Sequence, residues 1–116
     1  MALSREDILS ADDLKREKHS VPEWGGDVYL SVMGGDDREV FEGINEKREA
    51  GNASELDVLA SLLAFTLTDE HGNKLFSLED LEALKCKSAA VLVRLGTRAA
   101  NLNAVTADDI EDLKGN

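Results

Sequence analysis

The segment between positions 54 and 68 restricts the fold of this chain more than any other, because it is apolar almost all the way round. Ser54 stands three residues before Asp57, a spacing in which the serine caps free amides at a helix start and the carboxylate complements the positive helix end. Large apolar side chains recur at Leu56, Val58, Leu59, Leu62, Leu63, Phe65 and Leu67. The remaining polar stripe consists of Ser54, Asp57, Ser61 and Thr68. Such a helix is expected at the centre of a domain, or partly covered by another chain.

Helical patterns flank this segment on both sides. The run from 36 to 50 ends at Gly51 and places on one face Val40, Phe41 and Ile44. After a polar turn at 69–76, Ser77 and Asp80 repeat the capping signal. The inner face of the helix that follows is predicted to be Leu78, Leu81 and Leu84.

The C-terminal part of the chain carries two more predicted helices. The inner face of the run from 88 to 102 is formed by Val91, Leu92, Leu95, Ala99 and Leu102, and its polar stripe by Arg94, Arg98 and Asn101. We expect this helix to pack against the 54–68 helix. Thr106 with Asp109 caps a short final helix closed by Gly115, whose apolar residues are Ile110 and Leu113.

The N-terminal third of the chain lacks the long helical patterns of the rest. Residues 1–18 are predicted to form short helical turns and a linker, with capped starts at Ser4 and Ser10. From 19 to 33 the pattern alternates, with Val28, Leu30 and Val32 on one face and Tyr29, Ser31 and Met33 on the other. Gly25-Gly26 can supply the positive φ angles of a tight turn, so we predict a β-hairpin at 19–33. Pro22 lacks an amide donor, so its strand should be an edge or pair only on its other side.

Length and composition agree with these elements. The chain has 116 residues, 42% hydrophobic and only 4% aromatic, which fits one domain spanning 1–116 and disfavours a strand-rich fold. The predicted fold class is mainly α: an N-terminal β-hairpin followed, within 36–114, by a compact bundle of about four to five short helices, a helix-dominated α+β domain.

The net charge of −11 speaks against binding nucleic acid or an anionic membrane surface. The single cysteine, Cys86, cannot form an internal disulfide, and no segment resembles a secretion signal or a bilayer span. We therefore expect a protein of a reducing cytoplasm.

No motif predicts catalysis, a cofactor or a metal. The acidic stretch 69–80 has the length of a calcium loop, but Lys74 occupies the position that requires glycine and His71 is a poor calcium ligand. His19 and His71 lack zinc-ligand spacing, and Cys86 has no histidine nearby in sequence to act as a base. A calcium-regulated module remains a weaker alternative, which a rise in melting temperature with calcium would reveal.

The order of several short motifs resembles the tail assembly chaperones of long-tailed bacteriophages. In the first half these are ILSADDL at 8–14, VPEWGG at 21–26 with the strand after it, and the charged helix start leading to Phe41. In the second half they are TDEHGNKLF at 68–76, EAL at 82–84, KSAA at 87–90, RL at 94–95, LN at 102–103 and the acidic ending at 108–113. Departures from the family pattern are SVMGGDD at 31–37, where a polar Thr-Gly turn is expected, and His71, where an acidic residue is common.

The resemblance implies a non-enzymatic morphogenesis factor in the host bacterial cytoplasm. Such a protein coats the tape measure protein, recruits major tail tube protein subunits and leaves before the virion is complete. It also implies self-association, and often a longer frameshifted product. For contacts with a client or another copy, we predict Trp24, Val28, Tyr29, Leu30, Leu63 and Phe65.

An alternative function is an acidic interaction protein that mimics nucleic acid or inhibits a host protein. It predicts carboxylates concentrated on one face, whereas here they are dispersed over several helix starts.

Overall fold

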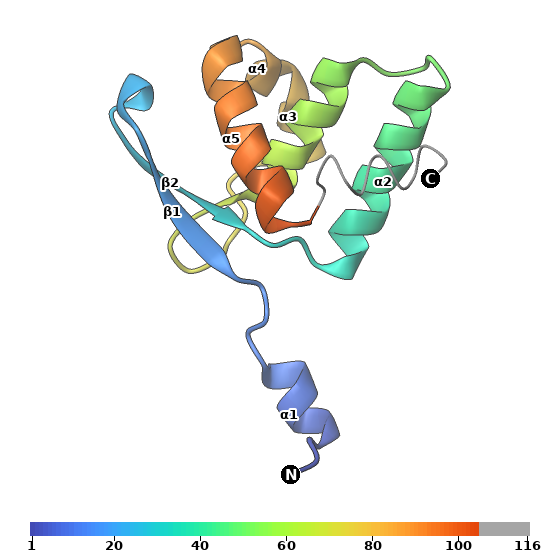
Figure 1. Ribbon diagram of the computed structural model, residues 1–116, viewed down its shortest axis with the longest axis vertical. Helices are drawn as coiled ribbons and strands as arrows, with labels where there is room; N and C mark the ends of the chain where they lie inside the picture. The colour runs from blue at the N-terminus through green and yellow to red at the C-terminus, as the bar shows by residue number, and fades with distance from the viewer. Residues whose placement is uncertain (105–116) are drawn as a thin grey trace.

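The computed structural model describes residues 1–104, which form a three-stranded antiparallel sheet beside a group of helices, with a short N-terminal helix standing apart (Figure 1). In chain order the elements are α1 (Arg5–Ser10), β1 (Arg16–Val21), the 3₁₀ turn η1 (Pro22–Trp24), β2 (Gly26–Ser31), α2 (Gly35–Glu49), α3 (Glu55–Thr66), β3 (Leu67–Thr68), the 3₁₀ turn η2 (Leu78–Asp80), α4 (Leu81–Lys85) and α5 (Ala89–Leu102). The predicted helix-dominated α+β class with an N-terminal hairpin is confirmed. The predicted final helix, with Ile110 and Leu113, lies outside the described residues.

The N-terminal segment folds partly as predicted. Ser4 caps α1 in a capping box with Asp7, whose side chain accepts the Ser4 backbone N–H at 3.0 Å. The second predicted cap, Ser10, is instead the last residue of α1, and its hydroxyl donates back to the Glu6 carbonyl at 2.7 Å. Strand β1 begins at Arg16, earlier than the predicted start at 19, because Val32 N–H bonds to the Lys15 carbonyl and extends the pairing toward the N-terminus.

The hairpin tip differs from the predicted two-glycine turn. Pro22 starts a 3₁₀ turn between the strands, so it needs no edge position in a ladder, and only Gly25 has a positive φ, +80°. Gly26 already belongs to β2, where it pairs with Val21. A proline at the first position of the turn has a suitable φ and no amide to leave unpaired, which explains why the turn begins there.

The sheet has a third strand that the sequence pattern does not indicate. Helix α3 ends at Thr66, and the chain continues as β3, which pairs antiparallel with β2 through Tyr29 opposite Thr68 and Leu30 opposite Leu67. The hydroxyls of Ser31 and Thr68 hydrogen-bond to one another at 2.8 Å while both residues are buried. Leu30 and Ser31, which the predicted alternation places on opposite faces of β2, are both buried, so both faces of the strand are covered here, and the Thr68 hydroxyl satisfies that of Ser31.

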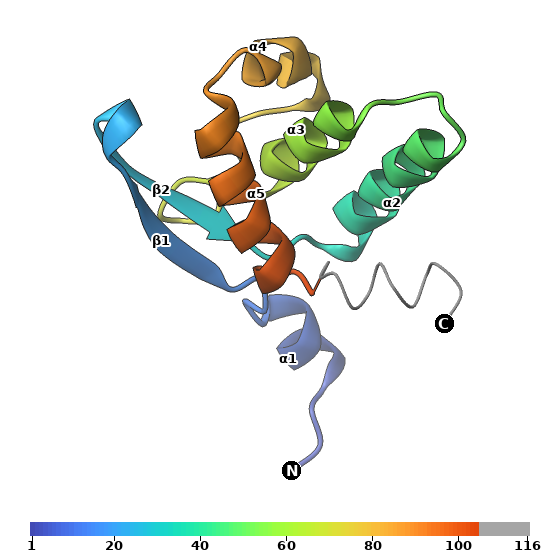
Figure 2. The ribbon, with the colours of Figure 1, turned by 45° about the horizontal axis from the view of Figure 1, so that its top comes forward.

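Helix α3 is the centre of the domain, as predicted. It packs against α2, α4, α5 and β2, and the helices cover one side of the hairpin in Figure 2. Two members of its polar stripe, Ser61 and Thr68, are buried; Ser61 donates to the Val58 carbonyl at 2.8 Å. The main core consists of Val21, Leu30, Met33, Phe41, Leu62, Leu63, Phe65, Leu67, Val91, Leu92, Leu95 and Ala99.

The predicted helix faces are right at most positions and wrong at two. Helix α5 buries Val91, Leu92, Leu95 and Ala99 and packs against α3, as expected. Val40 on α2 and Leu78 at the start of η2 are exposed rather than inward. The reason at Leu78 is that the capped start is a 3₁₀ turn, which shifts the facing of its first residue relative to an α-helix.

Helices α3 and α5 approach closely at Gly96. A Cβ atom at this position would collide with the Leu59 side chain, so glycine is the residue that permits the observed spacing. The contact leaves Gly96 buried within α5 and sets the distance between the two helices.

Asn103, at the end of α5, joins parts of the chain that are far apart in sequence. Its Oδ1 accepts the Met33 backbone N–H at 2.6 Å, and its Nδ2 donates to the carbonyls of Ser31 at 3.2 Å and Ala99 at 2.9 Å. The Arg38 side chain donates to the Asn103 carbonyl at 2.8 Å. These bonds fasten the connection between β2 and α2 to the C-terminal end of α5.

Candidate binding surfaces

The polar loop between β3 and η2 uses its acidic residue to hold its own shape. The Asp69 carboxylate accepts the backbone N–H of His71 at 2.8 Å and of Asn73 at 2.9 Å, and the Asn73 side chain at 3.0 Å. Hydrogen bonds from Asn73 are the main reason that the pKa of Asp69 is lowered. The resemblance of this stretch to a calcium loop is therefore explained by a turn that its own aspartate caps.

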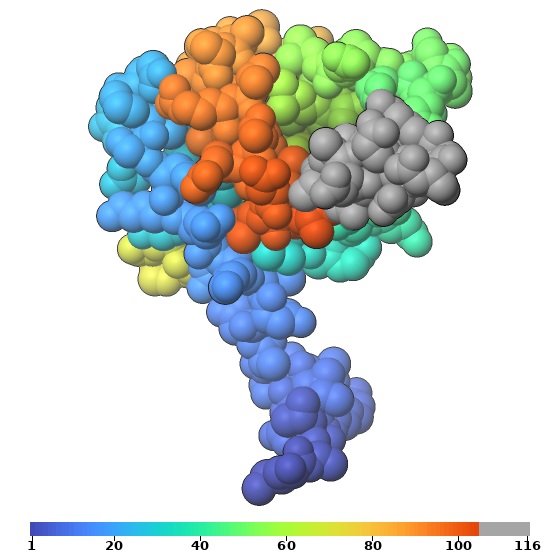
Figure 3. All heavy atoms as spheres, viewed as in Figure 1, coloured from blue at the N-terminus to red at the C-terminus, as the bar shows by residue number. Residues whose placement is uncertain are grey.

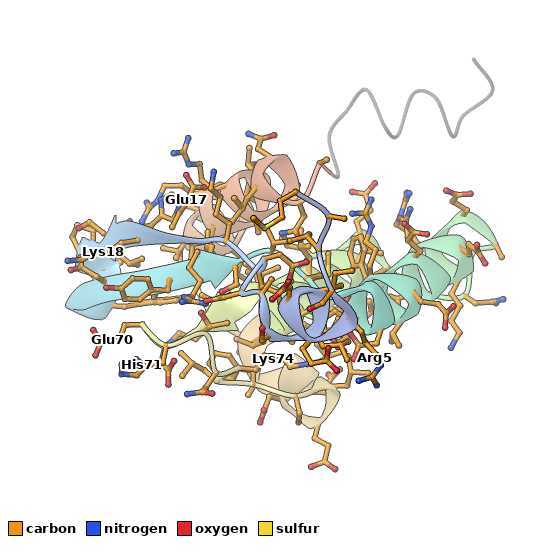
Figure 4. All side chains as sticks on the ribbon, turned by 90° about the horizontal axis from the view of Figure 1, so that it is seen from below. Arg5, Glu17, Lys18, Glu70, His71 and Lys74 are labelled. Carbon is orange, nitrogen blue, oxygen red and sulfur yellow. The ribbon has the colours of Figure 1, made fainter. Side chains whose placement is uncertain are left out.

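Charged residues on the underside of the molecule spread over several elements instead of converging. Figure 4 shows Glu17 and Lys18 on β1, Glu70, His71 and Lys74 on the loop after β3, and Arg5 on α1. Within residues 1–104, no group of three or more His, Cys, Asp or Glu side chains is placed to hold a metal ion. In the same part of the chain, no helix combines the length and apolar character that crossing a bilayer requires.

The first concave surface, which we call the hairpin-tip cleft, lies between η1 and the η2–α4 region. Its volume is about 460 Å³, and its lining consists of Glu23, Trp24, Phe76, Asp80, Ala83, Leu84 and Lys87. The Lys87 ammonium lies 5.8 Å from the centre of the Trp24 ring, within range of a cation–π contact.

An ion pair holds the hairpin tip against α5. Arg94 Nη1 and Nη2 each donate to one oxygen of the Glu23 carboxylate, both at 2.8 Å. This two-pronged contact lowers the pKa of Glu23 to about 2. The cleft is therefore bounded by a fixed turn whose single tryptophan is half-buried.

The structure separates the predicted contact residues into two groups. Trp24, Val28 and Tyr29 are half-buried on the hairpin, and of these Trp24 and Val28 pack against the core. Leu30 and Leu63 are fully buried, with no exposed surface, so their side chains stabilise the core and present nothing to a partner in this conformation.

Phe65 lies between these two groups. Its side chain is buried in the main core, and the Lys74 ammonium stands 5.8 Å from the ring centre. The same lysine pairs with Asp37 at 2.7 Å, so the ring sits beneath a charged pair near the surface.

The second concave surface, which we call the helix groove, was not predicted. It runs between α2, α3 and α5 with a volume of about 380 Å³, and its lining consists of Phe41, Asn45, Arg48, Glu55, Val58, Leu59, Leu62, Val93, Gly96, Thr97 and Ala100. Val93 is exposed although it belongs to an otherwise amphipathic helix. In the sequence, the exposed Val93 and the nearby Gly96 are the two features that could have indicated this surface.

The third surface is the arm, by which we mean residues 1–15. None of the residues of α1 is buried. The arm exposes Met1, Leu3, Ile8, Leu9 and Leu14, and the space-filling view shows it projecting from the body of the molecule (Figure 3). Like the helix groove, the arm was not predicted as a binding surface; the sequence predicted only short helical turns and a linker over 1–18.

Comparison with solved structures gives an informative likeness. The structure superposes on that of the bacteriophage HK97 tail assembly chaperone with a TM-score of 0.61 and 23% sequence identity, over 84% of this chain and 90% of the HK97 chain. The chain shares that fold. No protein-family model matches the sequence, and no curated protein matches it.

The likeness covers most of both chains, so it includes the arrangement of the hairpin and helices and is not limited to one shared motif. It confirms the predicted resemblance at the level of the fold.

Proposed function

We propose that this protein is a phage tail assembly chaperone that binds the tape measure protein and tail tube subunits in the host cytoplasm and catalyses no reaction. The observation that carries the proposal is the fold shared with the HK97 tail assembly chaperone over most of both chains. The sequence resemblance, based on the order of short motifs, also supports it.

The concave surfaces suit the binding of apolar helices. Both the hairpin-tip cleft and the helix groove combine apolar walls with charged residues at the margin: Glu23 and Lys87 in one, Arg48 and Glu55 in the other. An amphipathic helix binds such a surface with its apolar face while its polar face stays in water. A net charge of −11 favours the solubility of a complex with an apolar client.

Among the residues predicted from the sequence, we assign client contact to Trp24, Val28 and Tyr29. They are half-buried on the hairpin, so part of each side chain remains accessible. Trp24 contributes most in this scheme, because a tryptophan beside a cleft supplies a large apolar area at low entropic cost.

The alternative of a nucleic-acid mimic is less well supported. Mimicry of phosphates requires a continuous acidic surface, whereas the carboxylates of Glu23, Asp37 and Asp57 pair with Arg94, Lys74 and Lys85 respectively. Cations are therefore interleaved with the acidic residues on the body of the protein.

Co-expression with the tape measure protein of the same phage tests the proposal. We expect the tape measure protein to become soluble and to co-purify with this chain. If the tape measure protein stays insoluble and is not retained, the proposal fails. Capture of a host nucleic-acid-binding protein under the same conditions would favour the alternative.

A matched pair of variants tests the contact residues. Trp24→Ala should reduce the recovered tape measure protein several-fold, because a buried aromatic anchor dominates an interface. Leu75→Ala removes an exposed apolar side chain from the loop after β3 and should leave recovery unchanged. Equal recovery with both variants would remove Trp24 from the client surface.

A further inference from the structure

The helix groove presents apolar surface that the described part of the chain leaves uncovered. Val93 on its α5 wall is exposed by 57%. The charges at its margin are balanced, because Arg48 and Glu55 approach one another to 4.0 Å. An occupant of the groove is therefore held by apolar contact and shape, and not by a charge of one sign.

The chain leaves α5 at one end of this groove. Ala100, in the groove wall, precedes Ala104 by about one helical turn. On the other side, Arg38 of α2 donates to the Asn103 carbonyl at 2.8 Å, and Phe41, also in the wall, follows Arg38 by about one turn. Both ribbon views accordingly show the end of α5 beside the start of α2 (Figures 1 and 2). The segment after Ala104 therefore begins at the end of the groove that lies between α2 and α5.

The direction of the chain changes at Ala104. Its φ is +57°, and among residues 1–104 it is the one residue other than glycine with a positive φ. This left-handed conformation ends an α-helix and turns the chain off the helix axis, and it is unfavourable for a residue with a Cβ atom. The Ala104 amide bonds to the Asn101 carbonyl at 3.2 Å, and the hydrogen bonds of Asn103 fix the residue before it. Contacts made beyond this turn are expected to offset its unfavourable conformation.

The sequence of residues 105–116 predicts a short amphipathic helix. Thr106 and Asp109 provide the capping signal. The apolar side chains follow at intervals of three, at Ala107, Ile110 and Leu113. The residues between them are acidic: Asp108, Asp109, Glu111 and Asp112. Such a helix can bury its apolar stripe in a groove while its carboxylates remain in water, so it needs no opposite charge in the groove.

The length of this segment suits the helix groove and excludes the hairpin-tip cleft. As a helix it would span about 18 Å, whereas the α5 wall of the groove from Ala100 to Val93 spans about 10 Å. The hairpin-tip cleft lies beyond the opposite end of α5, where Lys87 precedes the first residue of the helix, roughly 20 Å away along α5. A helix that runs back along α5 from Ala104 would bring Leu113 to Val93 and would end before the cleft.

We propose that residues 105–116 fold back on their own chain and cover the helix groove, with Ile110 beside Thr97 and Leu113 beside Val93. Because the segment is tethered at the end of the groove, its effective concentration there is on the order of millimolar, so a contact of modest intrinsic affinity is populated. The covered groove is closed to an apolar helix of a client until that helix displaces the segment. This competition rests on the proposed function, whereas the docking itself does not.

Pairs of engineered cysteines test the docking in the full-length chain, with the single native cysteine replaced by C86S. V93C/L113C places two thiols where the proposal brings the side chains together. R98C/L113C is the matched control, because Arg98 is also exposed and is nearer to position 113 along the chain, but lies outside the groove wall. On mild oxidation at high dilution, V93C/L113C should form an intramolecular disulfide at least about tenfold faster than the control. Labelling of the remaining thiols measures the rate, and a non-reducing gel separates links within one molecule from links between two.

Two results of this experiment would overturn the proposal. Equal rates in the two cysteine pairs would mean that the tether alone brings the thiols together, without docking in the groove. Disulfides that form only between molecules would mean that the groove receives the segment of a second copy and not its own.

A dye that fluoresces on apolar surface, 8-anilinonaphthalene-1-sulfonate, gives an independent readout. I110S/L113S removes two apolar side chains, yet it should raise the dye fluorescence about twofold or more, because it uncovers the groove. E111S/D112S changes the acidic side of the same segment and should leave the fluorescence at the wild-type level. An unchanged or lower fluorescence in I110S/L113S would contradict the proposal, since these two side chains would then not have been covering the groove.

Co-purification of the tape measure protein tests the competition separately. I110S/L113S should retain several-fold more of it than the wild type, because the groove is open, and E111S/D112S should retain as much as the wild type. Equal retention by all three proteins would overturn the competition. Failure of all three to retain the tape measure protein would overturn the proposed function and the competition with it, whereas the docking is decided by the disulfide rates alone.

Discussion

Helices α1 and α3 begin with the same device and have opposite environments. Each starts with a serine whose side chain accepts the amide of an aspartate three residues later, and that aspartate accepts the serine amide in return. Yet α1 buries no residue, whereas α3 buries every residue from 60 to 66. The comparison shows that a capping box determines where a helix begins, while the apolar residues after it determine whether the helix belongs to the core.

Truncating one apolar residue in each helix should give the largest difference. Leu63→Ala in α3 should lower the free energy of unfolding by about 2–5 kcal/mol, because it leaves a cavity at a fully buried site. Leu9→Ala in α1 should change it by less than about 0.5 kcal/mol, because the side chain is already in water. Urea denaturation at a dilution that excludes association measures both. Similar losses in the two variants would show that α1 is part of the core.

Removing a buried polar contact should have the next largest effect. Asn103→Ala leaves the Met33 amide and the Ser31 and Ala99 carbonyls without this partner, which should cost about 1–3 kcal/mol of unfolding free energy. Asn101→Ala, at an exposed position on the same helix, is the control and should be nearly neutral. Urea denaturation of both variants is the measurement, and an equal loss at the two sites would contradict the role given to Asn103.

The caps themselves provide a sharper form of the comparison. Ser54→Ala should lower global stability by about 1 kcal/mol, because α3 unfolds together with the core. Ser4→Ala should leave global stability unchanged and increase hydrogen exchange only at the amides of α1, whose opening is local. A global loss from Ser4→Ala would contradict the independence of the arm.

The hairpin tip is neither central like α3 nor separate like α1, because the ion pair between Glu23 and Arg94 holds it against α5. Lowering the pH should release it. The pKa of Glu23 is lowered from 4.5 to about 2 by the hydrogen bonds from Arg94, so the stabilisation by this contact is complete above about pH 4.5 and is lost as pH falls toward 2. Fluorescence of Trp24, the single tryptophan, should report the release near pH 2. Glu23→Gln should show the released spectrum already at pH 7. An unchanged low-pH transition in that variant would assign it to another group.

The sequence predicted local features well and distant ones poorly. The caps at Ser4, Ser54 and Ser77 were predictable because both partners lie within a few residues. Strand β3 was not, since Leu67 and Thr68 continue the predicted helix pattern of apolar face and polar stripe, and their pairing with β2 depends on a distant segment. The role of Asn103 depends on a contact with Met33, seventy positions away, which no local pattern encodes.

The same difference between local features and distant contacts applies to the candidate binding surfaces. Side-chain type pointed to the hairpin, where the structure places Trp24 beside a cleft. It could not distinguish Leu63, which is fully buried, from Leu56 on the same helix, which is 39% exposed, because that difference depends on which neighbours cover α3. The helix groove requires three separate segments to meet, so it emerges only from the tertiary structure.

The close approach of α3 and α5 at Gly96 has a consequence for recognition. Because Gly96 has no side chain, the Leu59 side chain of α3 packs directly against the backbone of α5 there and forms part of the wall of the groove. A ligand peptide would then find its receptor already shaped, and little of the binding free energy would be spent on opening it. A larger residue at position 96 would displace the Leu59 side chain and so change the shape of the groove that the ligand meets.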